Sequence, residues 1–253
     1  MSTQLVSASE IPGAARTELF NASYAGYFIP VHVDEAALAW MVDAWDIDLA
    51  RSRVALLDGD PAGFANLGLR EGVGWIGGVG VVPEHRRSGL GRRLMEAVLA
   101  EAPGDVWLEV IEQNEPAIRL YDRLGFTTMR MLDVWSWAED PPPASAREAE
   151  PRLLQDDAPW QTARPSLDEL ELLEVDGGAI LFRPGEHVRV VQLAAHDEGI
   201  AAALLAAARA RGSSLHYVNA PSDSVGSRAL RDLGALLELR QLEMKLSRPR
   251  PTG

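Results

Sequence analysis

The sequence contains no cysteine, and this absence removes disulfides, thiolate nucleophiles and thiolate metal ligands together. It also contains no apolar run long enough to span a bilayer, and its first residues lack the charged start and apolar stretch of a signal peptide. We therefore expect a cytoplasmic protein with no membrane partner and no bound metal. The five histidines are scattered without metal-ligand spacing, at His32, His85, His187, His196 and His216.

Positive charge is scarce as well, since 24 Lys and Arg stand against 37 Asp and Glu, for a formal net charge of -13. Such a charge repels nucleic-acid backbones, so we expect no nucleic-acid partner. A negative net charge can attract a cationic acceptor such as an amine, although in many proteins it only increases solubility. Hydrophobic residues make up 47% of the 253 residues, which is enough for two domains with real cores.

Four arginines nevertheless gather in one short segment. An apolar run ends at Pro83, a polar turn follows, and apolar residues return at helical spacing from Leu90, which predicts a strand, a tight loop and a helix. With Gly89 and Gly91 at the join, backbone N–H groups, the helix dipole and the arginines favour an anion. A turn with solvated arginines is the alternative, and a lone Gly-x-Gly would favour it. The arginines are Arg86, Arg87, Arg92 and Arg93.

The spacing Arg-x-x-Gly-x-Gly, after a strand that ends in Val-x-Pro, resembles the pyrophosphate loop of the GNAT family of acetyl-CoA-dependent N-acyltransferases. Two ordered motifs at the family's separation are more specific than either motif alone. The resemblance covers the first half of the chain and implies an α/β (α+β) fold, a mostly antiparallel twisted sheet flanked by helices. The second motif comprises Leu108-Glu109-Val110, Asn114, Ala117-Ile118, Leu120-Tyr121 and Leu124-Gly125-Phe126.

The resemblance implies an N-acetyltransferase that moves an acetyl group from acetyl-CoA to a primary amine by direct attack. The acceptor is then a small molecule or the amine of a peptide, and no metal takes part. For Asn114, helix capping is an alternative to binding the cofactor arm, and one side chain can do both. The implied cofactor contacts are Val79, Val81, Arg86, Arg87, Ser88, Gly89, Leu90, Gly91, Arg92 and Asn114.

Two residues are the expected acid and base of this reaction. The family motif places the hydroxyl equivalent to Tyr121 next to the cofactor sulfur, so Tyr121 is the expected acid, with a core residue of the helix as the alternative. Glu109 is the expected base, because strand alternation lets it project from the sheet and some N-terminal acetyltransferases of the family use a glutamate in this setting. Water, Glu71 or Glu112 is the alternative base, and a solvated surface carboxylate is the alternative for all three glutamates.

Three aromatic residues, Tyr24, Tyr27 and Phe28, cluster before Pro30. In the resembled fold, the segment between the first two helices forms one wall of the acceptor site. These side chains are therefore expected substrate contacts, with an aromatic core plug beneath a loop as the alternative.

Apolar periodicity and turn residues predict the elements of the first half. Glycines in the fourth strand either make room for the cofactor arm or form a β-bulge. The last two strands close the sheet as a pair. The predicted strands are 4–8, 52–57, 63–69, 73–82, 105–111, 126–131 and 132–137, and the predicted helices are 11–25, 34–45, 89–102 and 116–124.

The second half repeats this order in a weaker form. We predict a catalytic domain over 1–138, a Pro- and Ala-rich linker over 139–152, and a shortened, degenerate GNAT-like domain over 153–253. Its predicted strands are 170–175, 179–183, 187–193, 214–218 and a closing pair within 236–246, and its helices are 198–211 and 224–233.

The second half lacks the chemistry of the first. Its loop at 195–199 has one glycine, no arginine and two carboxylates, which would repel a phosphate. Counted from Asn219, the position of Tyr121 is held by Gly226. We predict a non-catalytic domain that covers a sheet edge or shapes the acceptor cleft.

Two other functions stay open at this stage. One is an acyl-CoA-binding regulatory module without catalysis, and the other is an interaction protein in which the halves only dimerise. The acceptor amine and the choice between monomer and homodimer are undetermined, because the acceptor walls of this fold are loops with little sequence signature.

Overall fold

A computed structural model describes residues 2–164 and 167–248, which form two compact units. The first unit comprises Met1–Met129 and Glu243–Gly253, and the second comprises Arg130–Leu242. These boundaries differ from the predicted ones at 138 and 153, because strands β6 (Thr127–Trp137) and β12 (Leu236–Leu246) each contribute residues to both units. Within the described residues, no helix combines the length and apolar character needed to cross a membrane.

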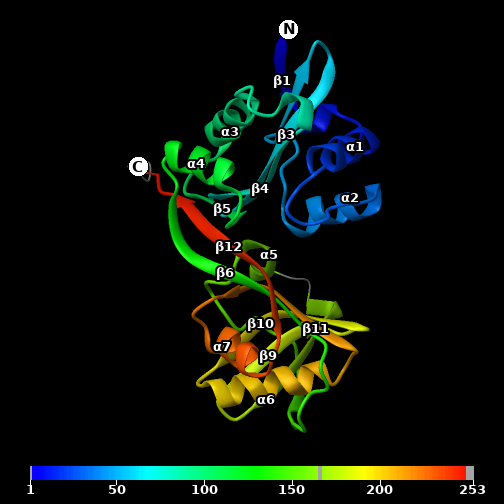
Figure 1. Cartoon of the computed structure of the whole chain (residues 1–253), viewed down its shortest axis with the longest axis vertical. Coiled ribbons are helices and arrows are strands. Elements are labelled where there is room, and N and C mark those ends of the chain that lie inside the picture. The colour runs from blue at the N-terminus through cyan, green and yellow to red at the C-terminus, as the bar shows by residue number, and fades with distance from the viewer. Residues whose placement is uncertain (1, 165–166, 249–253) are drawn as a thin grey trace. The chain divides into compact units, whose positions relative to one another are not determined.

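The first unit is a mostly antiparallel sheet, as expected, in the order β1-β2-β3-β4-β5 followed by the end of β12 (Figure 1). Only the β4–β5 pair in this unit is described as parallel. The strands are β1 Thr3–Ser7, β2 Arg53–Leu57, β3 Asp60–Arg70, β4 Val73–Val81 and β5 Val106–Ile111. The helices are α1 Gly13–Ser23, α2 Glu35–Ala44, α3 Leu90–Glu101 and α4 Glu115–Arg123, with short 3-10 turns at Ala8–Glu10 and Pro83–His85.

Helices cover both faces of this sheet. Consecutive residues of β3 point to opposite faces: Phe64 stacks on Phe20 of α1 at 5.5 Å, whereas Gly63 lies against Leu94 of α3. Leu38 of α2 joins the cluster around Phe20. Helices α1 and α2 therefore pack on one face of the sheet and α3 packs on the other.

Strands β4 and β5 separate soon after they meet. Their parallel pairing is limited to Gly74 with Val106 and Trp75 with Trp107. On its other side β4 stays paired with β3 as far as Val81, apart from a bulge in which Gly77 has no opposite residue. The β-bulge, which is the alternative explanation for the glycines of this strand, is thus present at Gly77. The second half of β4 has no β5 partner for its backbone among the described pairs.

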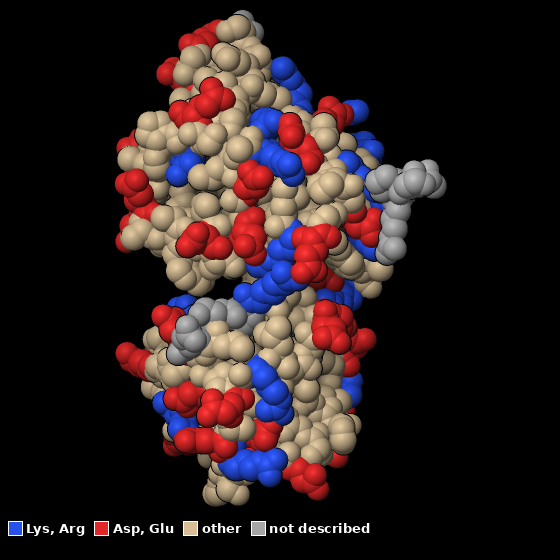
Figure 2. Space-filling model, turned by 180° about the vertical axis from the view of Figure 1, so that it is seen from behind, with Lys and Arg blue, Asp and Glu red and all other residues tan. Residues whose placement is uncertain are grey.

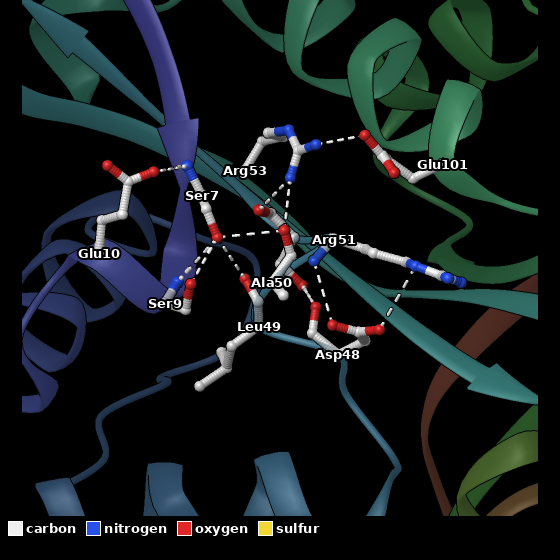
Figure 3. Close-up of polar contacts among 10 residues, drawn as sticks. Ser7, Ser9, Glu10, Asp48, Leu49, Ala50, Arg51, Arg53 and Glu101 are labelled. Atoms are coloured by element: carbon white, nitrogen blue, oxygen red, sulfur yellow. Dashed lines mark hydrogen bonds and ion pairs between the residues drawn. The ribbon is translucent and has the colours of Figure 1, made fainter.

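Helix α3 is fixed at its C-terminal end by residues from distant parts of the chain. Arg53 bonds Glu101, the last residue of α3, and also the carbonyl of Ala50, while Ser7 holds the carbonyls of Leu49 and Ala50 (Figure 3). The guanidinium of Arg248 donates to the carbonyls of Leu99 and Ala102 at 2.6 and 2.8 Å, which caps the helix end.

The second unit has the strand order β6-β11-β10-β9-β8-β7. Its strands are β7 Arg147–Ala149, β8 Glu171–Val175, β9 Gly178–Arg183, β10 His187–Ala195 and β11 Ser214–Pro221, together with parts of β6 and β12. Its helices are α5 Trp160–Ala163, α6 Glu198–Arg209 and α7 Val225–Asp232, with a 3-10 turn at Leu167–Glu169. Strand β7 lies inside the predicted linker, so that segment is not a linker throughout.

Both predicted closing pairs of strands are wrong. Residues 127–137 form the single strand β6, and residues 236–246 form the single strand β12. Neither stretch contains a Gly, Pro or Asn at which a hairpin would turn. In the second unit β6 pairs with β11, from Leu132 opposite Pro221 to Trp137 opposite Leu215.

The sheet of the second unit is apolar on both faces. Consecutive residues of a strand pack into different hydrophobic clusters. Leu173 and Ile180 belong to the cluster that includes residues of α6 and α7, whereas Leu172 and Leu181 belong to the cluster on the opposite face. This alternation is why its strands are rich in branched apolar residues.

Candidate active site

A cleft of about 820 Å³ opens in the first unit, at the place where β4 has lost its β5 partner. It lies between the end of β4, the loop after Pro83, the first turn of α3, one side of α4 as far as Arg123, and the end of α1 with the segment that follows. Predicted and unpredicted residues therefore meet in one site. The lining includes Val79, Val81, Arg86, Arg87, Gly89, Gly91, Arg92, Asn114, Tyr24, Tyr27 and Phe28 from the predicted set.

The N-terminus of α3 has no side-chain cap. Gly89 precedes the helix in the left-handed region, at φ 87°, where glycine has no steric penalty. No described side chain accepts a hydrogen bond from the first-turn N–H groups, so these donors are open to the cleft lined by Gly89 and Gly91. An uncapped helix start of this kind binds phosphate groups.

The lining is strongly basic for an acidic chain. On the face shown in Figure 2, acidic and basic side chains are interspersed, yet the described residues that line the cleft include five arginines and no carboxylate. Arg119 and Arg123 belong to this set and were not predicted. Their signal was available, because four residues separate them and place them on one side of the predicted helix 116–124.

The side chain of Arg86 binds backbone carbonyls near the start of the loop. Its guanidinium donates to the carbonyls of Val81, Ser23 and Ala25 at 3.2, 3.2 and 2.7 Å. These bonds join the end of β4 to the end of α1 and occupy donors that the sequence reasoning assigned to phosphate.

Two other predicted contacts, Ser88 and Leu90, are absent from the described cleft lining. The Ser88 hydroxyl donates to the carbonyl of His85 at 2.7 Å, and Leu90 is buried in the core. What these two residues offer a ligand is therefore their backbone N–H groups.

Asn114 caps α4 and also reaches the aromatic wall. Its Oδ1 accepts from the N–H of Ala117 at 3.3 Å, and its Nδ2 donates to the Tyr27 hydroxyl at 3.5 Å. Tyr27 packs edge-on against both Tyr24 and Phe28. Burial raises the pKa of Tyr27, and the bond from Asn114 opposes that rise.

Tyr121 lies beneath the cleft. It is 8% exposed, packs on Phe126 at 5.9 Å and is absent from the described lining, although its neighbour Leu120 is part of it. Burial first, and the nearby Tyr27 second, raise the pKa of Tyr121, so its hydroxyl stays protonated at neutral pH. It can donate a proton but does not lose one to water.

Glu109 is half-buried on β5 and held by β4. The indole N–H of Trp75 donates to its Oε2 at 2.7 Å. The Trp75 ring lies over Gly77, where a Cβ would come within 2.5 Å of it, so the bulge makes room for the ring. Glu71 and Glu112, the alternative bases, are both exposed.

The corresponding helix start in the second unit is closed to anions. Asp197 caps α6 and accepts from the N–H of Ile200 at 2.9 Å, and Glu198 pairs with Arg228. A carboxylate therefore holds the donors that stay open at Gly89.

The prediction that Gly226 holds the position of Tyr121 is wrong. Helix α4 ends with the N–H of Phe126 donating to the carbonyl of Tyr121, and α7 ends in the same way from Ala235 to Leu230. The equivalent residue is therefore Leu230, which has no hydroxyl. The count failed because Asn219 lies within β11, whereas Ser224 caps α7.

Among residues 2–164 and 167–248, no group of three or more His, Asp or Glu side chains could hold a metal ion.

Comparisons with known proteins agree with this geometry. Residues 17–126 match the model of the acetyltransferase (GNAT) family. An N-alpha-acetyltransferase of Saccharolobus solfataricus is 29% identical over 118 residues, which are 44% of this chain and 69% of the relative. A putative acetyltransferase structure from Pyrococcus horikoshii has a TM-score of 0.69 at 14% identity and covers 98% of this chain and 89% of its own.

A tandem GNAT protein from the clavulanic acid biosynthesis pathway has a TM-score of 0.64 at 14% identity, and the match covers 97% of this chain and 98% of that one. The likeness shows that the fold of the whole chain, including the second unit, is that of a tandem GNAT protein. Residues 17–126 lie within the first unit, where the cleft is found. Residues 17–126, in the first unit, therefore match the GNAT acetyltransferase family, and the chain as a whole resembles a tandem GNAT protein in fold.

Proposed function

We propose that the first unit is an acetyl-CoA-dependent N-acetyltransferase with an amine acceptor. The observation that carries this proposal is the uncapped start of α3, which opens into an arginine-lined cleft free of described carboxylates in a chain of charge -13. That donor set fits a diphosphate. The backbone of β4 near Val79 and Val81 has no β5 partner on one side, which fits an extended arm that would bond it as an added strand does.

Bound acetyl-CoA would supply the acyl thioester. The N–H groups from Arg87 to Arg92 hold the diphosphate in this scheme. Glu109 accepts a proton from the ammonium so that the neutral amine can attack, with water as the alternative carrier. Tyr121 would donate a proton to the departing sulfur, and the proton that the attacking nitrogen releases on forming the amide would restore the Tyr121 hydroxyl. The acceptor is a small-molecule or peptide amine, and the relationship to an N-alpha-acetyltransferase makes a peptide N-terminus the first acceptor to try.

A second candidate, an acyl-CoA-binding module without catalysis, is favoured by one observation. Tyr121 is 8% exposed and absent from the described cleft lining, so its hydroxyl must become accessible before it can reach a sulfur. Acetyl transfer by the wild type separates the two candidates, and its loss in Tyr121→Phe assigns the acid.

The anion site is tested by Gly91→Leu. A Cβ at this position would meet only Val81 and Leu120, at 3.8 and 3.9 Å, so the variant should fold while its side chain fills the diphosphate position. We expect coenzyme A affinity to fall at least about 100-fold by calorimetry. Gly91→Ala is the matched control and should bind nearly as the wild type does. Unchanged affinity in Gly91→Leu would exclude this site.

A further inference from the structure

Ser23, the last residue of α1, has a buried side-chain hydroxyl. The residue is 5% exposed, and its Oγ has no hydrogen-bond partner among the described residues. Buried hydroxyls are usually bonded, because leaving one unpaired costs its full desolvation. Thr17 in the same helix shows the usual solution, since its Oγ1 donates to the carbonyl of Gly13 at 3.0 Å.

Ser23 also lies in the cleft wall, against the part of β4 that has no β5 partner. It lines the cleft together with Gly80, and a Cβ at Gly80 would come within 2.5 Å of the Ser23 Cβ. Glycine at this position therefore lets Ser23 approach the β4 backbone, beyond the last pairing of β4 with β5.

The backbone of Ser23 is held in place. Arg86, from the loop before α3, donates to the carbonyls of Ser23 and Ala25 at 3.2 and 2.7 Å. The only freedom left to the hydroxyl is rotation about the Cα–Cβ bond, among three staggered positions. The loop that precedes the anion site thus also positions this hydroxyl.

We propose that the Ser23 hydroxyl binds the amide- and hydroxyl-bearing arm of the acyl donor, and that it makes this bond only when the cleft is filled. This inference rests on the function proposed above. A serine hydroxyl both donates and accepts, so it suits either end of an amide. The Ser23 hydroxyl then has no described partner within the protein because its partner is the bound arm.

The test is Ser23→Ala, measured with two probes. Coenzyme A carries the arm, whereas adenosine 3′,5′-bisphosphate carries the nucleotide phosphates without it. We expect coenzyme A to bind about three- to tenfold more weakly, as the loss of one neutral hydrogen bond predicts, and the bisphosphate to bind as in the wild type. The melting temperature of the unliganded variant should be equal or higher, because a buried unpaired hydroxyl has been removed.

Thr17→Val is the matched control, since it removes a buried hydroxyl of the same helix that is already bonded. It should lower the melting temperature and leave coenzyme A affinity unchanged. Wild-type affinity for coenzyme A in Ser23→Ala, or equal weakening of both probes, would overturn the inference. A wild-type protein that takes up neither probe would instead overturn the proposed function.

Discussion

The two units share an order of strands and helices but differ at the point where the first could bind an anion. In the first unit, β4 and β5 pair over two residue pairs, and the following helix starts at an uncapped glycine. In the second, β10 and β11 pair over four, from His187 opposite Ser214 to Val190 opposite Tyr217, and Asp197 caps the helix. The fold is thus retained without the open donors.

The difference extends to the proposed acid. Tyr121 of α4 is matched by Leu230 of α7, which is fully buried. In the second unit, therefore, the start of α6 is capped and the residue equivalent to Tyr121 cannot act as an acid. Together these changes support the proposal that the second copy keeps the packing of the fold without the chemistry proposed for the first.

The largest effect should come from removing the part of the second copy's last strand that belongs to the first unit. A chain that stops after Leu242 loses the end of β12, the Lys245–Asp105 pair at 2.7 Å and the Arg248 cap on α3. We expect the first unit to lose cooperative thermal unfolding, because β5 is left with an open edge.

Arg248→Ala provides a graded comparison for that truncation. It should lower the free energy of unfolding by only about 2–3 kcal/mol, since it removes charged hydrogen bonds and leaves the strand. Normal cooperative melting of the truncated chain would show that the two copies are independent.

The next effect is on turnover. Tyr121→Phe should reduce acetyl transfer about 100-fold or more, the usual contribution of a general acid, while coenzyme A affinity stays unchanged. Tyr217→Phe is the control, because Tyr217 is also a buried tyrosine with a raised pKa but lies in the second unit. Equal turnover in both variants would remove the acid role of Tyr121, and coenzyme A binding without turnover in the wild type would support the binding module.

The smallest effect is expected in the second unit alone. Asp197→Ala removes the cap of α6 and should lower the free energy of unfolding by about 1 kcal/mol in denaturant titrations. It should leave turnover unchanged. A gain of a second coenzyme A site in this variant would mean that the carboxylate alone closes the second copy.

The sequence predicted local structure better than it predicted pairing between distant strands. The strand-loop-helix at Gly89 and the cap at Asn114 appear where residue chemistry places them. That β6 and β12 each contribute residues to both units could not be inferred from the sequence. No residue within 127–137 or 236–246 specifies which strand that stretch will pair with.

The same limit applies to the site. Glycines and arginines indicated the cleft, but the sequence could not tell that Arg86 holds backbone carbonyls or that Tyr121 is buried. Such roles depend on which side chains meet after folding. The pair of Arg119 and Arg123, in contrast, was readable from helical spacing.

The central claim is that one copy of the fold binds an acyl donor and the other does not. Calorimetric titration of the full chain with coenzyme A tests this most directly, with Gly91→Leu measured alongside. The account predicts one site per chain, abolished in that variant. Uptake of two equivalents, or of none, would contradict it.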